Sequence, residues 1–330
     1  MQQYIDIDSA QVDGPTVLTI GNFDGMHRGH QALLQRLRSL AATLDQRQGA
    51  LHHQTGLITF DPHPLAVLQP ERPQALLTTP QERLALAADL GVDLGVIQTF
   101  TPEFARLEPR AFLQLLKNHL GMAALVVGPD FALGRNRTGD IVVLHQLGEE
   151  LGYLLHVVEP ITWHGETQVR SSAIRQALAQ GDVQTAADML GRPYTVAGTV
   201  VAGDGRGRQL GIPTANIQTA PEKLLPADGV YATWAQLPSS NGVETYASVT
   251  NLGTRPTIGG QERRLETHLL DFPAPGRSDD LYGQTVTLLL VARLRGEQRF
   301  PNLDALVTQI HTDIAEARAI LGPVSPPTSV

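Results

Sequence analysis

Short apolar runs alternate with helix-like segments over the first 190 residues. The apolar runs, which are typical of buried strands, lie at 16–20, 56–60, 92–98, 123–127 and 153–158. After the first run, leucines recur at steps of three and four, at Leu33, Leu34, Leu37 and Leu40. Strands that alternate with helices predict a parallel sheet covered by helices, in which ligands bind beyond the carboxyl ends of the strands.

The pattern changes after Gly191-Arg192-Pro193, where apolar runs follow one another with only Gly, Pro, Asn and Asp between them. These strand candidates lie at 195–201, 229–236, 244–250, 264–270 and 285–294. Successive short strands predict a compact antiparallel barrel. We therefore expect an α/β domain over 1–190, a barrel domain over 191–322, and a frayed Pro- and Ser-rich tail over 323–330.

Three helices have recognisable ends. Thr79-Pro80-Gln81-Glu82 is a capping box with proline at the first helical position, and a second helix is predicted from about Glu108 to Leu120. Near the C-terminus, apolar positions between Leu303 and Leu321 fall on one helical face, with Asn302 as the predicted N-cap. This last helix is expected to close the barrel.

Composition narrows the functional classes. The chain of 330 residues has no cysteine, which excludes disulfides, thiolate metal sites and a cysteine nucleophile. A formal charge of −8 argues against a nucleic-acid or anionic-membrane partner. The N-terminus lacks the basic and apolar regions of a signal peptide, and no apolar run approaches the ~20 residues that span a bilayer. A cytoplasmic protein is expected, and homo-oligomer formation stays open.

The turn after the first predicted strand reads Gly21-Asn22-Phe23-Asp24-Gly25-Met26-His27-Arg28-Gly29-His30. A glycine-rich turn that leads into a helix aims free backbone N–H groups and the positive end of the helix dipole at one point. His27 and His30 can both face a phosphate bound there. The alternative, half of a zinc site, lacks a cysteine to complete it and gives no reason for three glycines. The residues alone support an anion site.

A second glycine-rich segment, Gly203 to Gly211, precedes Pro213-Thr214-Ala215-Asn216 in the barrel half. Its backbone can approach phosphate oxygens closely. Arg206 and Arg208 could add charge-assisted contacts. In an extended segment Thr214 and Asn216 project to the same side, and their neutral oxygens together with nucleotide phosphates suit Mg²⁺.

Other nucleotide-binding motifs fit the sequence less well. The glycine-rich segment is not a Walker A loop, because no Gly-Lys-Ser/Thr follows, and its glycine spacing does not fit a dinucleotide-binding fingerprint. Asp130-Phe131-Ala132 imitates part of a kinase D-F-G, but no other protein-kinase motif accompanies it. A long barrel hairpin without function remains the structural alternative.

Downstream, Glu266 begins an apolar strand, either as an edge charge that blocks aggregation or as a general base.

The first motif closely resembles the G-x-F-D-G-x-H-x-G-H signature of nucleotidyltransferases that attack the α-phosphate of ATP. The resemblance implies a Rossmann-like domain with an ATP site in which the histidines stabilise charge on the transferring phosphoryl group. The segment Arg170-Ser171-Ser172-Ala173-Ile174-Arg175 resembles the family's I-S-S-T-x-I-R, so that a serine would cap a helix and Arg175 would hold phosphates. The implied ATP contacts are Gly21, Phe23, Asp24, Gly25, His27, Gly29, His30, Ser171 and Arg175.

Two further segments resemble this family's flavin-binding loops. Phe60-Asp61-Pro62-His63-Pro64 resembles F-x-P-H-P, and Gly128 to Gly134 resembles G-x-D/N-F-x-F-G. The implied flavin contacts are Phe60, His63, Asp130 and Phe131. The usual pattern has an arginine and a second aromatic where this chain has Ala132 and Leu133, which puts FMN binding in doubt. His52 and His53 match nothing and are expected at the surface.

From Arg192 to the closing helix the chain closely resembles riboflavin kinases. The resemblance implies that Thr214 and Asn216 hold Mg·ATP and that Glu266 accepts the proton of the riboflavin 5′-hydroxyl. Asn251 and Arg255 are expected to contact the flavin. The implied contacts of the loop with ATP are Gly203, Gly205, Arg206, Gly207, Arg208 and Gly211, beside Thr214 and Asn216.

The two resemblances together cover nearly the whole chain and match the bacterial bifunctional riboflavin kinase/FAD synthetases. They imply that the barrel converts riboflavin and ATP to FMN, and that the N-terminal domain joins FMN to AMP, with Mg²⁺ as the cofactor and ATP as co-substrate. Riboflavin, FMN and ATP would be the small-molecule partners. Two other hypotheses compete: a monofunctional enzyme whose transferase half has decayed, and a non-catalytic flavin or nucleotide sensor.

Overall fold

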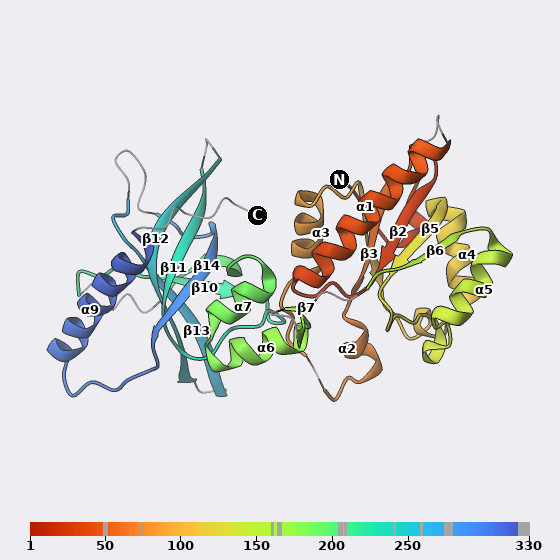
Figure 1. Cartoon of the computed structure of the whole chain (residues 1–330). Helices are drawn as coiled ribbons and strands as arrows, with labels where there is room; N and C mark the ends of the chain where they lie inside the picture. Colours follow the sequence, from red (N-terminus) through yellow and green to blue (C-terminus); the bar gives the residue numbers. More distant parts are fainter. Residues whose placement is uncertain are drawn as a thin grey trace. The chain divides into compact units, whose positions relative to one another are not determined.

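The computed structural model forms two compact units, one of Met1–Ser171 and one that begins at Ser172 (Figure 1). The described residues are 1–48, 52–72, 74–159, 162–163, 167–203, 207, 210–239, 242–257, 260–273 and 280–322. The division falls before the expected boundary at 190 because two helices belong to the second unit. Helix α6 (Ser171–Gln180) is tied to barrel strand β14 (Thr285–Arg295), since the Arg293 guanidinium donates a hydrogen bond to the Gln180 carbonyl at 3.3 Å.

The first unit is built on a six-stranded parallel sheet in the order β1-β4-β3-β2-β5-β6. The strands are β1 (Gln2–Ile5), β2 (Thr16–Ile20), β3 (Gln54–Asp61), β4 (Leu94–Thr99), β5 (Met122–Val127) and β6 (Leu154–Val157). The predicted parallel sheet is therefore confirmed. The apolar pattern misses β1, since this edge strand is half polar and pairs only with β4.

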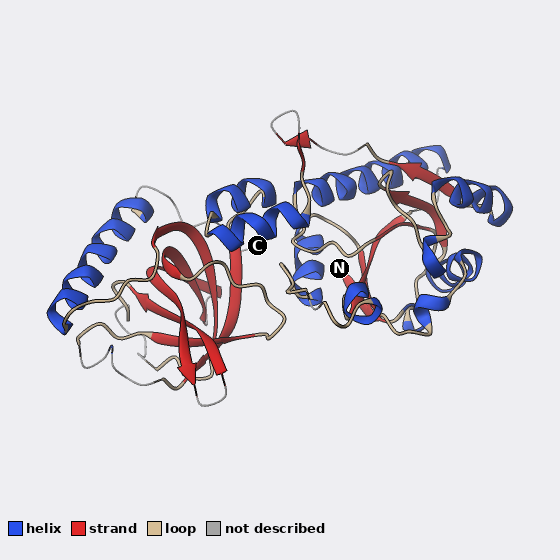
Figure 2. Cartoon of the chain, turned by 90° about the horizontal axis from the view of Figure 1, so that it is seen from below, coloured by secondary structure: helices blue, strands red, loops and turns tan. Residues whose placement is uncertain are grey.

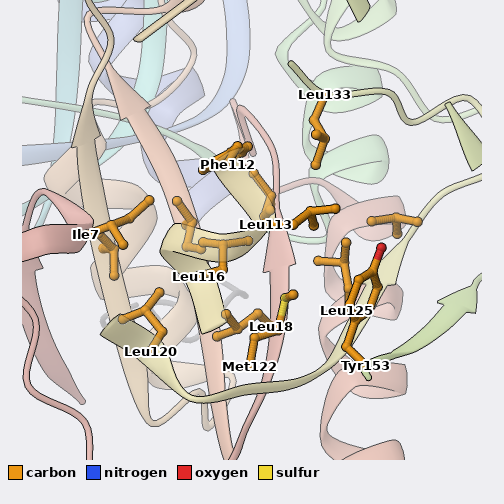
Figure 3. Packing of buried hydrophobic residues seen from close by; sticks show 14 of the residues in the cluster. Ile7, Leu18, Phe112, Leu113, Leu116, Leu120, Met122, Leu125, Leu133 and Tyr153 are labelled. Atoms are coloured by element: carbon orange, nitrogen blue, oxygen red, sulfur yellow. The ribbon is translucent and has the colours of Figure 1, made fainter. Parts of the chain in front are cut away.

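Helices cover both faces of this sheet. Helices α1 (Arg28–Gln48) and α3 (Pro80–Asp89) pack on one face, and α4 (Pro109–Leu120) and α5 (Ile141–Leu151) pack on the other. Figure 3 shows the second interface, where α4 presents Phe112, Leu113, Leu116 and Leu120 to the strands. The predicted capping box of α3 is present, with reciprocal hydrogen bonds between Thr79 and Glu82.

The smaller elements of the described chain connect these layers or lead to the barrel. They are 3-10 helices at Ile7–Ser9, Phe104–Arg106 and Arg135–Arg137, the short helix α2 (Pro64–Leu68), the pair β7 (Thr162–Trp163) and β8 (Thr167–Gln168), and α7 (Val183–Leu190). Strands β7 and β8 form a separate antiparallel pair.

The second unit contains a closed barrel in the order β10-β13-β12-β11-β14-β9, in which every neighbouring pair is antiparallel (Figure 2). Beside β14, its strands are β9 (Tyr194–Val201), β10 (Ala215–Thr219), β11 (Gly229–Ser239), β12 (Gly242–Thr257) and β13 (Gly260–Leu269). The predicted barrel is confirmed. Its interior contains a chain of fully buried hydroxyls, from Ser248 through Thr233 and Thr250 to Thr267, at spacings of 2.7–2.9 Å.

Helix α9 (Leu303–Leu321) packs against the outside of the barrel, with Asn302 as its N-cap as predicted. A buried ion pair joins it to β14, because both nitrogens Nε and Nη2 of Arg295 donate to the Asp313 carboxylate at 2.8–3.1 Å. A cavity remains between α9 and the barrel wall, and it contains the residues expected to act on riboflavin.

Candidate active sites

Three of the predicted residues of the barrel stand side by side on neighbouring strands. The register pairs Asn216 of β10 with Glu266 of β13, and it pairs Glu266 with Asn251 of β12. Residues directly opposite each other in antiparallel strands project to the same face of a sheet. The carboxylate therefore lies between two side-chain amides on one side of the barrel wall, and we call this set the Asn-Glu-Asn row.

The cavity beside this row has a volume of about 610 Å³. One wall comes from the barrel and the preceding turn and includes Thr214, Asn251 and Glu266. The opposite wall is formed by α9 and the segment before it, where the apolar Phe300, Leu303, Leu306, Ile310 and Ile314 lie beside the polar Glu297, Gln298 and Asp313. A cavity of this size with both polar and apolar side chains in its walls suits an amphipathic ring system that carries a polar chain.

Glycines bring the backbone close to this polar wall. A Cβ atom added to Gly203 would collide with the Asn216 amide, and one added to Gly207 would collide with the Ile212 carbonyl oxygen. The Gly207 carbonyl accepts hydrogen bonds from the N–H groups of Leu210 and Ile212 at 3.1 and 2.9 Å, which closes a tight turn. Only glycine fits at these two positions, so the glycine-rich segment packs against the predicted metal ligands.

Some predicted residues of this site lie outside the described part. Gly205, Arg206 and Arg208 are not among the described residues, and for Arg255 only the backbone, in β12, is described. Gly211 has a φ of +73°, so it occupies the left-handed region that favours glycine. The roles of these five residues stay predictions.

The second site lies at the carboxyl end of β2, where the chain turns into α1. A cavity of about 320 Å³ is lined here by Gly21, Phe23, His27, Gly29 and His30. The end of β5 contributes the other side, with Asp130 and Phe131. Strands β2 and β5 are neighbours in the sheet, but their connections leave to opposite sides, and such a switch point is where open α/β sheets bind ligands.

The backbone of this turn is strained. Phe23 and Met26 have φ values of +48° and +43°, which non-glycine residues rarely adopt, and Gly25 between them has +86°. A hydrogen bond from the Met26 N–H to the Phe23 carbonyl at 2.9 Å closes the turn. Strain of this kind persists only where the surroundings enforce it, and it is frequent at functional sites.

The two histidines of the turn form a stacked pair, with ring centroids 3.6 Å apart and an interplanar angle of 17°. The His30 backbone N–H points to Nδ1 of His27 at 3.4 Å, so Nδ1 of His27 is the acceptor. Burial, followed by the charges of His27 and Arg83, holds the pKa of His30 well below its usual range. His30 is thus neutral, and its buried Nδ1 has no hydrogen-bond partner among the described residues.

Two family models match the two halves of the chain. One described as FAD synthetase matches residues 9–173, and one described as riboflavin kinase matches residues 190–321. The bifunctional riboflavin kinase/FMN adenylyltransferase of Escherichia coli (strain K12) is 38% identical over 312 residues, which cover 94% of each chain. This chain belongs to that bifunctional family. The two predicted activities, riboflavin kinase and FMN adenylyltransferase, are thereby confirmed.

A more distant relative agrees with this assignment, and a solved structure has a similar fold over nearly the whole chain. The bifunctional riboflavin kinase/FMN adenylyltransferase of Bacillus subtilis (strain 168) is 32% identical, covering 92% of this chain and 91% of its own. A crystal structure of a macrolide-efflux protein from Streptococcus pneumoniae has a TM-score of 0.84 at 27% identity, and the match covers 96% and 99% of the two chains. Among the helices of the described residues, none has the length and apolar character needed to cross a membrane.

Within this family member, Asp24 is directed into the protein interior and does not line the cavity. Its carboxylate accepts the backbone N–H groups of Leu77 and Thr78 at 3.2 and 2.9 Å and lies 3.5 Å from Arg83. Arg83 is fully buried and also donates to the Thr78 carbonyl at 2.9 Å and to the Thr59 hydroxyl at 3.1 Å. Asp24 thus holds the strained turn in place through hydrogen bonds and an ion pair in the protein interior.

Sequence reasoning missed Arg83, although a signal was present. The buried face of α3 consists of Pro80, Arg83, Leu84 and Ala87, so the arginine occupies an apolar position of the helical repeat. Long charged side chains are almost never fully buried unless they are paired. An arginine at such a position therefore indicates a buried acidic partner, which here is Asp24.

Two predicted flavin contacts lie away from the cavity lining. The Phe60 ring packs edge-on against Phe100 with centroids 5.5 Å apart, and Phe104 is 6.2 Å away. His63 is the N-cap of α2, where its Nδ1 accepts the Leu65 N–H at 3.2 Å. Both residues are held by local packing, and their contact with flavin stays a prediction.

The departure from the family pattern at Ala132 and Leu133 affects the cavity less than expected. Leu133 is 6% exposed and belongs to the core cluster with α4 and α5. The missing aromatic would therefore stand at a core position, whereas Phe131 remains in the cavity wall. This placement weakens the argument that the transferase half has decayed.

Ser171 and Arg175, two of the predicted ATP contacts, stand on α6. The Ser171 hydroxyl donates to the Asp24 carbonyl at 2.8 Å, so it contacts the turn directly. Arg175 stands on α6 in the second unit, and its contact with ATP stays a prediction.

The expectation that His53 lies at the surface is wrong: it is 2% exposed, because its Nδ1 pairs with Asp45 at 2.7 Å, while His52 is exposed.

Proposed function

We propose that Glu266 is the general base of the kinase reaction. It takes the proton of the riboflavin 5′-hydroxyl as that oxygen attacks the γ-phosphorus of ATP, and ADP leaves. The observation that carries this assignment is the Asn-Glu-Asn row, which pairs Glu266 with an amide on either side, and of which Glu266 and Asn251 line the cavity. The apolar side chains of α9 then receive the flavin ring, with Asn251 and Arg255 as contacts.

Thr214 and Asn216 fit a magnesium nucleotide. Both offer neutral oxygens, Thr214 is exposed in the cavity wall, and the described residues hold no cluster of three acidic or imidazole side chains that would bind a metal alone. Mg²⁺ usually keeps several waters and takes few protein ligands beside phosphates. When bound, it would neutralise charge on the transferring phosphate, and the glycine-rich segment would approach the same phosphates.

For the transferase we propose that His27 and His30 stabilise charge on the α-phosphate of ATP. A phosphate oxygen of FMN attacks the α-phosphorus, and pyrophosphate leaves without a covalent enzyme intermediate. The stacked imidazoles line the cavity at the helix N-terminus, where the positive end of the helix dipole favours an anion. Asp130 and Phe131, which line the opposite side, would contact the flavin.

Incubation of the purified protein with riboflavin, ATP and Mg²⁺, followed by chromatography of the products, tests this proposal. FMN and FAD are both expected, with release of ADP and pyrophosphate. FMN alone would indicate a monofunctional kinase, and binding without turnover would indicate a sensor. Supplied FMN should be converted to FAD without riboflavin, because the residues that line the two cavities belong to different units.

A further inference from the structure

We propose that His268 is a positioning residue of the kinase site. Its imidazole joins strand β13, which carries Glu266, to the backbone immediately before Thr214. This inference rests on the proposed function of the barrel and deepens it. It assigns a role to a residue between the two halves of the site, the general base and the nucleotide ligands.

The contact is a hydrogen bond between Nδ1 of His268 and the Pro213 carbonyl oxygen, 2.8 Å apart. A carbonyl only accepts, so Nδ1 carries the proton and donates. In the neutral ring, Nε2 is then the unprotonated nitrogen. His268 follows Glu266 by two residues and lines the same cavity, whereas Thr267 between them is buried in the barrel interior.

The segment that His268 reaches is otherwise weakly held. The ladder between β10 and β13 begins with Ala215 opposite Thr267. Upstream, among the described residues, the last backbone hydrogen bond of the turn is made by the Ile212 N–H. Pro213 has no N–H to donate, and both it and Thr214 are exposed.

The imidazole therefore anchors the backbone between the turn and strand β10, at the residue before the predicted metal ligand Thr214. Because the same strand carries Glu266 two residues earlier, this contact also sets the distance between the base and the nucleotide. Its loss would leave Glu266 in place, but it would let the Thr214 hydroxyl sample more positions. The expected consequence is weaker nucleotide binding with a smaller effect on the chemical step.

Two substitutions separate the ring nitrogens. The side-chain amide of His268→Asn can donate from near the position of Nδ1, while that of His268→Gln reaches the position of Nε2. For His268→Gln, the KM for ATP in riboflavin phosphorylation should rise about 3- to 10-fold, the usual worth of one hydrogen bond, with kcat changed less. His268→Asn should stay within about 2-fold of the wild type. Adenylylation of supplied FMN is the internal control and should be unchanged in both.

Two measurements complete the test without relying on turnover. Calorimetric titration of the full chain with Mg·ADP should show weakened binding at one of two sites in His268→Gln and not in His268→Asn. Nitrogen-15 NMR, with the His268 signals assigned by their disappearance in His268→Asn, should show the tautomer protonated at Nδ1.

The inference is overturned if His268→Gln keeps the wild-type KM for ATP, or if His268→Asn is impaired as strongly as His268→Gln. A ring protonated at Nε2 alone would also overturn it, and so would an equal loss of both activities, which indicates general destabilisation. Absence of riboflavin phosphorylation in the wild-type protein would instead refute the proposed kinase function, and the NMR tautomer would still decide the contact.

Discussion

The two units place phosphate-handling side chains by opposite means. In the first unit, one contiguous segment from Gly21 to His30 supplies both histidines and one side of the cavity, and the buried pair of Asp24 and Arg83 braces it. In the barrel, the Asn-Glu-Asn row comes from three strands far apart in the sequence. A site made by a single turn depends on local strain and buried charge, whereas a site made by a row depends on strand register. The two should therefore respond differently to mutation.

Glu266→Gln should give the largest and most selective effect. The amide keeps the shape of the row but cannot accept the proton, so riboflavin phosphorylation should fall by about 10²- to 10⁴-fold. Synthesis of FAD from supplied FMN should persist, as measured by chromatography of both products. Loss of both activities would contradict the separation of the two sites.

His30→Ala is the reciprocal experiment. Removal of one preorganised group beside the α-phosphate should reduce FAD synthesis by about 10²- to 10³-fold. Riboflavin phosphorylation in the same preparation serves as the control and should be unaffected. Undiminished FAD synthesis would remove the histidine pair from the mechanism.

Asp24→Asn should reveal how the turn is braced. The substitution removes the carboxylate charge that lies 3.5 Å from the buried Arg83 guanidinium, and breaking a buried pair typically costs about 3–5 kcal/mol. The first unit should unfold at a lower denaturant concentration while the barrel transition stays in place. The matched control is Asp89→Asn, an exposed position on α3 in the same unit, for which no shift is expected.

The lowered pKa of His30 predicts a pH dependence of the stability of the first unit. Because the native pKa of His30 is lowered, the unfolded chain binds a proton below about pH 6.5 before the native state does. The free energy of unfolding should therefore fall as the pH drops from about 6.5 towards the native pKa, by at most about 1.4 kcal/mol per pH unit. Denaturant titrations of the wild type and His30→Gln should differ in this slope, and equal slopes would contradict the assignment.

The smallest expected effect concerns two threonines of β2 that are both fully buried. The Thr16 hydroxyl donates to the Leu120 carbonyl at 2.7 Å, whereas the Thr19 hydroxyl has no partner among the described residues. Thr19→Val removes an unsatisfied polar atom and should leave the first unit as stable or stabilise it by about 1 kcal/mol. Thr16→Val should destabilise it by about 1–3 kcal/mol, because it orphans a buried carbonyl. Thermal unfolding that shows the same sign for both would refute this account.

The sequence predicts the site of the first unit better than the site of the barrel. The first is a contiguous turn, whereas the second is a row of residues from three strands. The motif from Gly21 to His30 predicts its own geometry, because its residues are neighbours in the chain and the helix start places both imidazoles. The strands of the barrel could be located from apolar runs, but the pairing of Asn216 with Glu266 and Asn251 requires the register, which no local pattern contains. His268 was missed for that reason, since its partner Pro213 lies 55 residues away in the chain.

Buried polar side chains were the other limit. Arg83 and His53 look like surface residues by type, and each is buried because a carboxylate distant in the chain or on the preceding helix compensates it. The edge strand β1 escaped detection since pairing with β4, and not apolar character, holds it in the sheet.

The hydrogen-bonded hydroxyls inside the barrel also affect the outer face of the barrel wall, which carries the Asn-Glu-Asn row. Thr250 and Thr267 are bonded to each other across β12 and β13, one position away from Asn251 and Glu266. Sliding β13 by a single residue would turn the Glu266 carboxylate inward, and it would break the hydrogen bond between Thr250 and Thr267 in the buried interior. The hydrogen-bonded hydroxyls in the barrel interior thus fix the strand register. That register determines that the three side chains of the Asn-Glu-Asn row lie side by side on the outer face.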